Sequence, residues 1–420
     1  MNDQDDRFTG RFKMVDLKRN ISIDECPMPE TFREKMGLVF SIAWLFYLGF
    51  VTRMMFAPLM PAMEQDLGFT HFQAGSLFLM MSIGYMLAPL CSGILSSKFN
   101  HKGALNISAW SIGLILLPFG VVESLWGIRI LLMIIGLAAG IHLPSAIAVI
   151  TGEVQKEDWG KALSVHQSAP PLSFVSAPLI AALMMSRFSW RVVLIFWAAA
   201  ALLTAMIYSL RGRGGGFPGQ LPDRKNAGII LSKPSFWIMV LLFAAAMGGN
   251  AGIYSMLPLF LTNEHGMELT RANTLIGLSQ ISGLLMVFAA GWITDRIGQK
   301  NMMFFTLLAA GISTILMGIL KGQWLLVIIF IQPAVLNSFF PGAFAALSRI
   351  APPALRSVTS ALGPPVSFLL GGGILPVIIG YLGESRSFSA GIILAGGFML
   401  AGLPMIYFLR LGQYDDESGC

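Results

Sequence analysis

Apolar segments of roughly twenty residues recur along the whole chain and are separated by short polar stretches. A segment of that length crosses the hydrocarbon core of a bilayer as a helix. The pattern therefore predicts an all-α integral membrane protein with twelve transmembrane helices. The expected spans are residues 37–61, 72–96, 104–122, 127–151, 162–185, 190–210, 235–262, 272–294, 302–320, 324–348, 357–383 and 388–410.

The composition agrees with this pattern. Only 12% of the 420 residues are charged and 55% are hydrophobic, with a mean hydropathy of +0.71, whereas a soluble domain carries about 25% charged residues. The three cysteines, Cys26, Cys91 and Cys420, are scattered along the chain, so they indicate neither a disulfide framework nor a metal site. We expect no cofactor and no bound metal, and a lipid bilayer as the surrounding partner.

The basic residues indicate which way the chain crosses the membrane. With both termini in the cytosol, 21 of the 28 Lys and Arg residues lie on the cytosolic side and six on the opposite side. This excess fixes the orientation by the positive-inside rule. The net charge of +6 therefore reflects topology, and we expect no nucleic-acid partner. The polar N-terminus lacks the apolar core of a signal peptide, so we expect no cleavage and a location in the plasma membrane, the inner membrane of a bacterium.

The two halves of the chain repeat one another. Four pairs of landmark residues are separated by a nearly constant offset of 197 or 198 residues. The stretch between the halves, residues 211–228, is rich in Gly, Pro and charge, which is typical of a linker. Parallel repeats of this kind leave a binding site between the halves near the membrane midplane. The pairs are Pro61 with Pro258, Pro144 with Pro341, Gly93 with Gly291, and Pro178 with Pro376.

This repeat divides the chain into five expected parts. They are a cytosolic tail (1–36), an N-terminal six-helix bundle (37–210), a cytosolic linker (211–234), a C-terminal six-helix bundle (235–410) and a cytosolic C-terminal tail (411–420). We expect the protein to be a monomer.

The loop after the eighth span carries a sequence motif. Residues 291–300 read GWITDRIGQK, which resembles the loop signature G-x-x-x-D-R-x-G-R/K-K/R of the major facilitator superfamily. The corresponding loop after the second span, GILSSKFNHK (93–102), is degenerate, since Ser97 replaces the Asp and Asn100 replaces the second Gly. The spans, the repeat and the linker extend the resemblance over residues 37–410. The matching residues are Gly291, Asp295, Arg296, Gly298 and Lys300 in the second half, and Gly93, Lys98 and Lys102 in the first.

The resemblance implies two six-helix bundles, related by a pseudo-two-fold axis, that move a solute by alternating access. It also implies that the signature is a gate and not a substrate site. Asp295 and Arg296 would latch against the cytosolic end of the fifth span, near Gly160 and Lys161, in the state closed to the cytosol. A carboxylate near a helix N-terminus is stabilised by roughly 0.3–1 kcal/mol. Ser97 cannot supply the matching charge, so we expect a lopsided latch.

One arginine, Arg53, stands in the middle of the first span, on a helix that the resemblance assigns to the central cavity. An arginine at a span centre costs about 2.5–3.5 kcal/mol and usually faces a cavity or a partner. Snorkelling to the outer interface would need a reach of roughly 12 Å. All 22 Asp and Glu residues fall in tails, loops or span ends, so no acid is available at mid-membrane. Two interpretations stay open: Arg53 binds a substrate anion, or it is hydrogen-bonded to carbonyls or polar side chains.

Two histidines lie within the spans. His142 is in the fourth span, another of the implied cavity helices, and a histidine can change its protonation near neutral pH. His142 is therefore a candidate for substrate binding or for proton coupling. His166 lies one turn into the fifth span and is the second proton-coupling candidate, although a lone histidine among apolar residues is more often a satisfied core residue.

Amides and a tyrosine complete the candidate substrate site. Asn250 and Tyr254 are four residues apart and share a face of the seventh span, and the repeat offset makes Asn250 the counterpart of Arg53. The pair could hydrogen-bond an anion, but the neighbouring glycines could equally serve to break or pack the helix. Gln332 and Asn337 in the tenth span are weaker candidates, because interhelical amides are common structural contacts.

These residues favour a secondary transporter of a small organic or inorganic anion, working as a proton symporter or an anion exchanger. The alternative is a drug/proton antiporter of the same superfamily, whose members often carry a Gly-Pro motif in the fifth span and a membrane carboxylate. The fifth span here contains no Gly-Pro motif, and no carboxylate lies at mid-membrane in any span. An enzyme would need a nucleophile with a base, or a metal cluster, and the spans offer neither, so we expect no enzymatic activity. A receptor or scaffold built on a transporter fold stays a further alternative.

Overall fold

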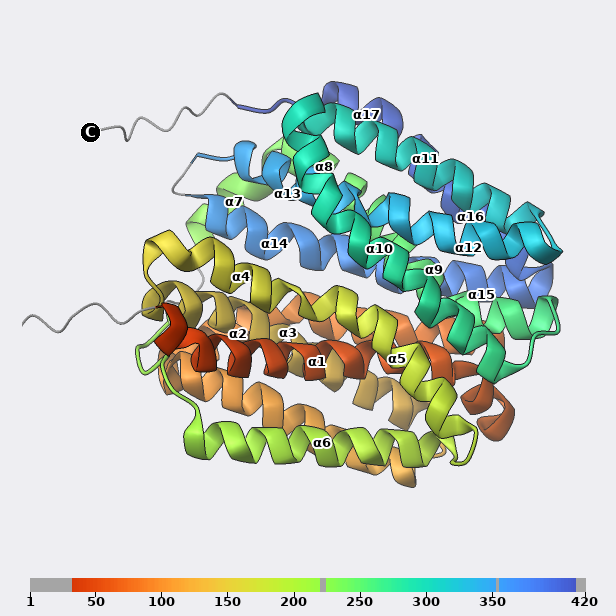
Figure 1. The fold of residues 1–420 in the computed structure, drawn as a ribbon, viewed down its shortest axis with the longest axis horizontal. Coiled ribbons are helices and arrows are strands. Elements are labelled where there is room, and N and C mark those ends of the chain that lie inside the picture. The colour runs from red at the N-terminus through yellow and green to blue at the C-terminus, as the bar shows by residue number, and fades with distance from the viewer. Residues whose placement is uncertain (1–31, 220–223, 353–354, 413–420) are drawn as a thin grey trace, which may run out of the picture.

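The computed structural model describes residues 32–219, 224–352 and 355–412. These residues form helices and no strand, and most helices run roughly along the long axis of the molecule (Figure 1). In this view the helices of residues 32–211 lie below those of residues 234–408. Most of the expected N-terminal tail and nearly all of the C-terminal tail lie outside the described residues.

The helices of the N-terminal half, residues 32–211, include two short 3₁₀ segments, η1 and η2. In chain order they are α1 (Phe32–Leu67), α2 (His71–Leu116), η1 (Leu117–Gly120), α3 (Leu125–Glu153), η2 (Lys156–Asp158), α4 (Trp159–Gln167), α5 (Ala169–Met185) and α6 (Trp190–Arg211).

The helices of the C-terminal half, residues 234–408, are interrupted by three π-helical segments, η3, η4 and η6. After α7 (Arg224–Leu231) they are α8 (Pro234–Met247), η3 (Gly248–Gly252), α9 (Ile253–Leu259), η4 (Phe260–Glu264), α10 (Leu269–Ile297), α11 (Gln299–Ile319), α12 (Gly322–Asn337), α13 (Phe339–Arg349), α14 (Arg356–Phe368), η6 (Leu369–Ile374), α15 (Leu375–Ser385), α16 (Phe388–Ala401) and α17 (Leu403–Phe408).

These helices account for the twelve expected spans. Among the described residues, ten helical stretches are long and apolar enough to cross a membrane, and a bent pair within α10 makes an eleventh. One of the ten, residues 71–120, contains two expected spans, 72–96 and 104–122. A kink at Asn100 separates these two spans, because its φ of 58° and ψ of 175° lie outside the helical region.

The kinks in the two repeated loops have similar backbone geometry. Gly298, between α10 and α11, has φ 82° and ψ 156°, which is close to the conformation of Asn100. A positive φ is costly for most residues with a side chain, but Asn tolerates it better than most. The Oδ1 atom of Asn100 accepts a hydrogen bond from the backbone N–H of Gly103 at 2.8 Å. The degenerate loop therefore keeps its turn although it lacks the glycine.

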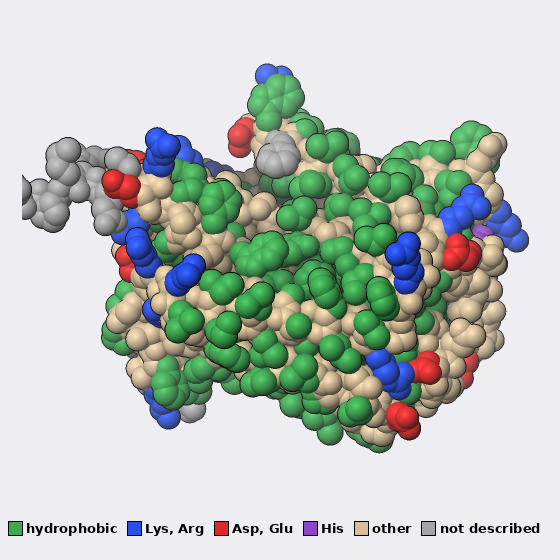
Figure 2. Space-filling view, turned by 60° about the horizontal axis from the view of Figure 1, so that its bottom comes forward, with side chains coloured by type: hydrophobic (Ala, Val, Ile, Leu, Met, Phe, Trp, Pro, Cys, Tyr) green, Lys and Arg blue, Asp and Glu red, His purple; other side chains and the backbone are tan. Residues whose placement is uncertain are grey.

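The surface of the bundle is apolar along its flank. Figure 2 shows hydrophobic side chains over the middle of this face, with charged side chains gathered toward its two ends. A continuous apolar surface of this kind is unfavourable in water and is solvated by lipid tails. The protein is thus built as a multi-pass membrane protein. Large exposed apolar residues from different helices include Leu203, Leu285, Phe305 and Trp324.

The bundle has two ends, which we name by their residues. The linker end is where α1 begins and α6 ends, and the predicted orientation places it in the cytosol. There the linker follows the N-terminal half: the backbone N–H of Gly219 donates to the carbonyl of Ser96 at 3.0 Å, and the N–H of Lys102 donates to the carbonyl of Gly215 at 2.9 Å. The far end is the opposite one, where α1 ends and α2 begins.

The two halves meet closely at the far end. There α1 packs against α9, and α2 packs against α15. Two glycines bring backbones into contact: a Cβ on Gly75 would lie 2.4 Å from the carbonyl oxygen of Pro376, and one on Gly380 would lie 2.2 Å from that of His71. The side chain of Asn273 also donates to the carbonyl of Pro58 across the two halves, at 3.0 Å. These contacts close the far end.

Two π-helical segments, η3 and η6, contact one another in the middle of the C-terminal half. A Cβ on Gly371 would lie 2.2 Å from the carbonyl oxygen of Ala244, and one on Gly252 would lie 2.5 Å from that of Gly371. The glycines around Asn250 therefore pack helices closely, as one of the two interpretations expected. Single-turn π segments inside α-helices are frequent at functional sites.

Candidate functional site

Arg53 lies on α1 at the level where the two halves meet. Its side chain is only 3% exposed, so it does not snorkel out of the bundle. Its guanidinium carbon lies 4.4 Å from the ring centre of Phe50, 4.3 Å from that of Tyr85 and 5.5 Å from that of Phe368. Phe50 and Tyr85 belong to the N-terminal half, and Phe368 belongs to α14 of the C-terminal half. Aromatic faces therefore surround the cation from both halves.

Arg53 lines a small pocket between the halves, here named the Arg53 pocket, with room for about one water molecule. Several buried polar atoms of its lining have no hydrogen-bond partner among the described residues: Nε and Nη1 of Arg53, Oγ of Ser82 and Oη of Tyr254. No acidic residue is part of this lining. The lining residues are Arg53, Met54, Ala57, Phe78, Met81, Ser82, Ala251, Tyr254, Ser255, Phe368 and Gly372.

The unpartnered groups of the Arg53 pocket suit a ligand. A buried polar group without a partner costs about 1–3 kcal/mol, and such groups are rare in native proteins. A guanidinium and two hydroxyls can all donate hydrogen bonds. The arrangement can therefore hold a small molecule that brings acceptor oxygens and a negative charge.

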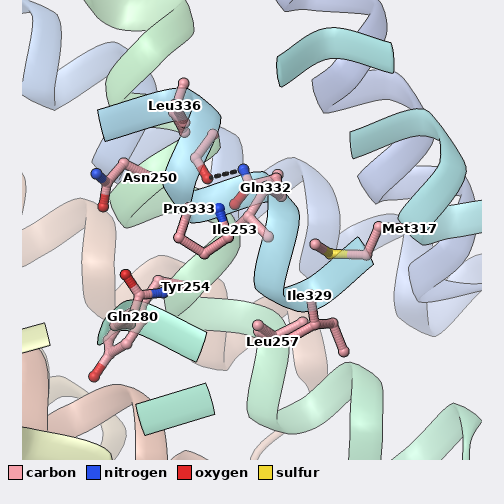
Figure 3. Close-up of a pocket in the computed structure, with 11 residues that line it drawn as sticks. Asn250, Ile253, Tyr254, Leu257, Gln280, Met317, Ile329, Gln332, Pro333 and Leu336 are labelled. Carbon is pink, nitrogen blue, oxygen red and sulfur yellow. Dashed lines mark hydrogen bonds between the residues drawn. The ribbon is translucent and has the colours of Figure 1, made fainter. Parts of the chain in front are cut away.

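A second pocket, here named the amide pocket, lies within the C-terminal half (Figure 3). The side chain of Gln332 donates to the carbonyl of Gly249 at 2.9 Å, and that of Asn250 donates to Oδ1 of Asn337 at 2.8 Å. Asn337 in turn donates to the carbonyl of Pro333 at 2.9 Å. In this conformation the amides bond to groups of their own half. The lining residues are Gly249, Asn250, Ile253, Tyr254, Leu257, Gln280, Met317, Ile329, Gln332, Pro333 and Leu336.

Tyr254 belongs to both pockets. Its ring meets that of Phe174 edge-on, with 4.9 Å between ring centres, so α9 and α5 pack through it. Figure 3 places Gln280 of α10 beside Tyr254 on the wall of the amide pocket. Gln280 was not anticipated from the sequence. The same signal that identified Gln332, an amide side chain inside an apolar span, was available for it.

His142 and His166 form a pair. Their Nε2 atoms are 3.3 Å apart, and the ring of Phe46 stacks on both imidazoles, with ring centres 5.2 Å and 4.4 Å away. In the neutral pair one Nε2 donates and the other accepts, so a single proton bridges the two rings. Neither histidine is part of the Arg53 pocket or the amide pocket. The structure thus brings the two proton-coupling candidates together, away from Arg53.

The signature residues lie at the linker end. Asp295 is exposed, and the guanidinium carbon of Arg296 lies 3.7 Å from the ring centre of Trp292 on the same helix. The ammonium of Lys161 pairs with Asp158 at 2.7 Å. The resemblance places the latch in the state closed at the linker end, whereas this conformation is closed at the far end, so the latch stays a prediction. Gly291, Gly298 and Lys300 follow the turn from α10 into α11, and Gly93 and Lys98 lie on α2.

An acid–histidine pair at the far end was not anticipated. The carboxylate of Glu64, at the end of α1, is only 8% exposed and lies 2.9 Å from Nδ1 of His71. The ring of His71 packs on Phe388 of the other half, with 4.8 Å between ring centres. Glu384 of that half accepts a hydrogen bond from the backbone N–H of Phe72 at 3.3 Å. Charged groups therefore join the close packing that closes this end.

Three residues around Arg53 were also missed. Ser82 and Tyr85 lie on α2, and Phe368 lies on α14, which correspond to the second and eleventh spans. The resemblance directed attention to the first, fourth, seventh and tenth spans only. Two polar residues three positions apart in an apolar span, Ser82 and Tyr85, share a helix face and were the available signal.

Comparison with known proteins places the chain in a family. The family model described as Major Facilitator Superfamily matches residues 39–363 and 270–418. Multidrug resistance protein MdtG of Serratia proteamaculans is 24% identical over 313 residues, which cover 71% of this chain and 75% of that protein. The gallate transporter of Pseudomonas putida is 22% identical over 379 residues, which cover 82% of this chain and 83% of that protein.

The fold is also that of solved transporters. The crystal structure of a bacterial homologue of the human lysosomal transporter Spinster, inward-facing and occupied, superposes with a TM-score of 0.78 at 14% identity. The match covers 89% of this chain and 96% of that chain. At this identity the likeness establishes the shared fold.

Proposed function

We propose, from the premise that this chain belongs to the major facilitator superfamily, that it transports a small anionic solute across the membrane. The transport is secondary and uses alternating access, as proton symport or anion exchange. The membrane is the plasma membrane, with both termini in the cytosol. The protein acts as a monomer and has no enzymatic activity.

The Arg53 pocket is the observation that carries this proposal. Its guanidinium is buried between the two halves, two of its nitrogens lack partners, and no acid lines the pocket. A bound anion would supply both the counter-charge and the missing acceptors. One edge of a guanidinium matches the two oxygens of a carboxylate or of an oxyanion such as nitrate. One of the relatives is named a gallate transporter, and gallate is a carboxylate, which agrees with this chemistry.

Drug/proton antiport is the second candidate. The relative named a multidrug resistance protein supports it, and so do the aromatic rings near the pocket. The positive charge of Arg53 opposes it, because an organic cation would be repelled by a guanidinium in a pocket whose lining holds no acid. A sensor or receptor on the same fold would bind the solute and transport nothing.

The histidine pair is the proposed site of proton coupling. A proton that bridges His142 and His166 links α3 to α4, and Phe46 links both rings to α1, the helix that carries Arg53. A second proton would place a charge on the pair and favour movement of these helices. His142 then acts on the solute through α1 and not by contact.

Binding to purified protein tests the anion proposal. We expect acetate, lactate or nitrate to raise the melting temperature of the wild type. Arg53→Ala should weaken this binding about 10- to 150-fold, because a hydrogen bond to a charged group contributes about 1.5–3 kcal/mol. Arg53→Lys should restore the binding in part, since lysine keeps the positive charge but cannot make the bidentate hydrogen bonds of a guanidinium. Arg187→Ala, which removes an exposed arginine in the loop before α6, is the matched control.

Uptake into proteoliposomes then separates the candidate functions. An anion transporter accumulates the labelled anion that stabilises it, and His142→Gln removes the dependence on a pH gradient if transport is a proton symport. Stabilisation by organic cations alone, unchanged in Arg53→Ala, would overturn the anion proposal in favour of drug antiport. Binding without any uptake would indicate a receptor.

A further inference from the structure

Besides the positive charge of Arg53, the Arg53 pocket presents other side chains to a solute. These side chains indicate what the rest of the solute, apart from its anionic group, is made of. Apart from Arg53, Ser82 and Tyr254, its lining is apolar, because the hydroxyl of Ser255 already donates to the carbonyl of Gly252 at 2.7 Å. A nitrate or acetate ion would use the polar groups and leave the apolar wall without a contact. A solute that fills the site therefore carries an apolar part next to its anionic group.

The apolar part of the site is rich in aromatic rings. Phe78, Phe368 and Tyr254 line the pocket. The ring of Tyr85 meets that of Phe368 at 5.3 Å between centres, so rings of the two halves already touch beside the guanidinium. Aromatic rings pair favourably face to edge or in offset stacks, which gives a flat ring an advantage over an aliphatic body of equal size.

The charge inventory limits the solute to one negative charge. Arg53 is the one Lys, Arg or His residue among the lining of the pocket. A phosphate ester with two charges would leave one of them unpaired in a low-dielectric site, which is strongly unfavourable. A carboxylate has one charge, which matches the guanidinium, and an oxygen that can accept a hydrogen bond from one of its unpartnered nitrogens.

The pocket can widen to accept a ring. Phe368 directly precedes the π-helical segment η6, and its ring occupies the space beside Gly372, where a Cβ would lie 2.8 Å from it. Met54 and Met81 form another part of the lining, and methionine adapts its shape easily. Rotation of these side chains opens the space now occupied by the ring of Phe368.

We infer that the solute is an aromatic monocarboxylate. Its carboxylate binds Arg53 and Ser82, and its ring lies among Phe78, Phe368 and Tyr254. This inference rests on the proposed anion transport and makes it specific.

A panel of four simple probes tests the inference on the purified full chain, by isothermal titration. Benzoate has the ring and one charge, acetate has the charge alone, benzyl alcohol has the ring alone, and cyclohexanecarboxylate has the charge with an aliphatic ring. We expect benzoate to bind about tenfold or more tightly than acetate, because the ring buries apolar surface. Cyclohexanecarboxylate should bind about threefold more weakly than benzoate, and benzyl alcohol should not bind measurably.

Two variants assign the effect to the pocket. Phe368→Leu should reduce the preference for benzoate over acetate about threefold or more. Phe305→Leu, at an exposed apolar position on α11, is the matched control and should bind like the wild type. Arg53→Ala should weaken the binding of both anions about 10- to 150-fold.

The outcomes separate the inference from the function on which it rests. Acetate or nitrate binding as tightly as benzoate, and still depending on Arg53, would overturn the aromatic inference and leave anion transport in place. Benzoate binding that is unchanged in Arg53→Ala would overturn both. Equal affinity for benzoate and cyclohexanecarboxylate would overturn the claim that the solute is aromatic. The solute would then be an apolar monocarboxylate of either kind.

Discussion

The two ends of the bundle are built differently. At the far end, backbones of the two halves touch at Gly75 and Gly380, and the buried Glu64–His71 pair adds to this packing. At the linker end, Asp295 is exposed and Lys161 is paired within its own half. Close packing is either made or broken, whereas exposed ionic groups exchange partners at little cost. In the proposed alternating-access cycle, a packed gate at the far end would therefore alternate with the predicted ionic latch at the linker end.

The largest effect is expected from a methyl group at the packed gate. Gly75→Ala places a Cβ 2.4 Å from the carbonyl oxygen of Pro376 and 2.8 Å from Cα of Val377, and neither backbone atom can move aside cheaply. The far end then cannot close, so uptake into proteoliposomes should fall close to background. Gly397→Ala on α16 is the control, because nothing lies within 4 Å of that position. Normal uptake by Gly75→Ala would show that this contact is not required.

The buried acid at the far end should have the next largest effect. Glu64→Gln removes the charge that faces His71 while keeping the shape of the side chain. We expect far-end closure to weaken by about 1.5–3 kcal/mol, the value of a charged hydrogen bond. Faster hydrogen exchange of residues 71–75 would reveal this change. Glu123→Gln, an exposed acid in a far-end loop, should exchange like the wild type.

The ionic gate should respond more mildly. Asp295→Asn should slow transport about two- to fivefold, because one carboxylate at a helix end contributes roughly 0.3–1 kcal/mol. The order of preference among solutes should not change, since Asp295 is remote from the Arg53 pocket. Uptake rates measured for two competing anions give both the transport rate and the order of preference. A reversed order of preference would contradict the gate role.

The smallest effect is expected from the cap of α10 at the far end. The hydrogen bond from Thr270 to Glu268 holds the pKa of this exposed carboxyl below its usual value of about 4.5. Because the folded pKa is the lower one, the cap stabilises the protein above about pH 4.5 and is lost as the pH falls through the folded pKa. Glu268→Ala should therefore lower the melting temperature slightly at pH 7 and have no effect in acid. A shift that grows in acid would contradict this assignment.

The spans could be predicted from sequence because membrane insertion depends on a local property, the length of an apolar run. The position of the kink at Asn100 was also predictable, since the expected spans 72–96 and 104–122 leave it in the loop between them. Its backbone geometry was not, because the sequence shows an asparagine where the signature has glycine. The structure explains this replacement through a hydrogen bond within the turn.

The candidate site was only partly predictable. Arg53 was found because one charge in an apolar run is unusual whatever surrounds it. Ser82 and Phe368 were missed because the face that each helix turns toward the pocket depends on how the helix is rotated in the bundle. The contact between His142 and His166 has the same origin, since residues 24 positions apart meet only through the packing of α3 and α4.

Arg53 also has an electrical consequence. Moving one elementary charge through 100 mV changes the free energy by about 2.3 kcal/mol. When access to the pocket changes sides, the charge of Arg53 crosses part of the membrane field although the residue itself hardly moves. In the proposed cycle the empty carrier is charged at this point and its return responds to voltage, whereas a carrier loaded with a monoanion is neutral there. If Arg53 binds the solute as proposed, the same residue makes one part of the cycle sensitive to the membrane potential.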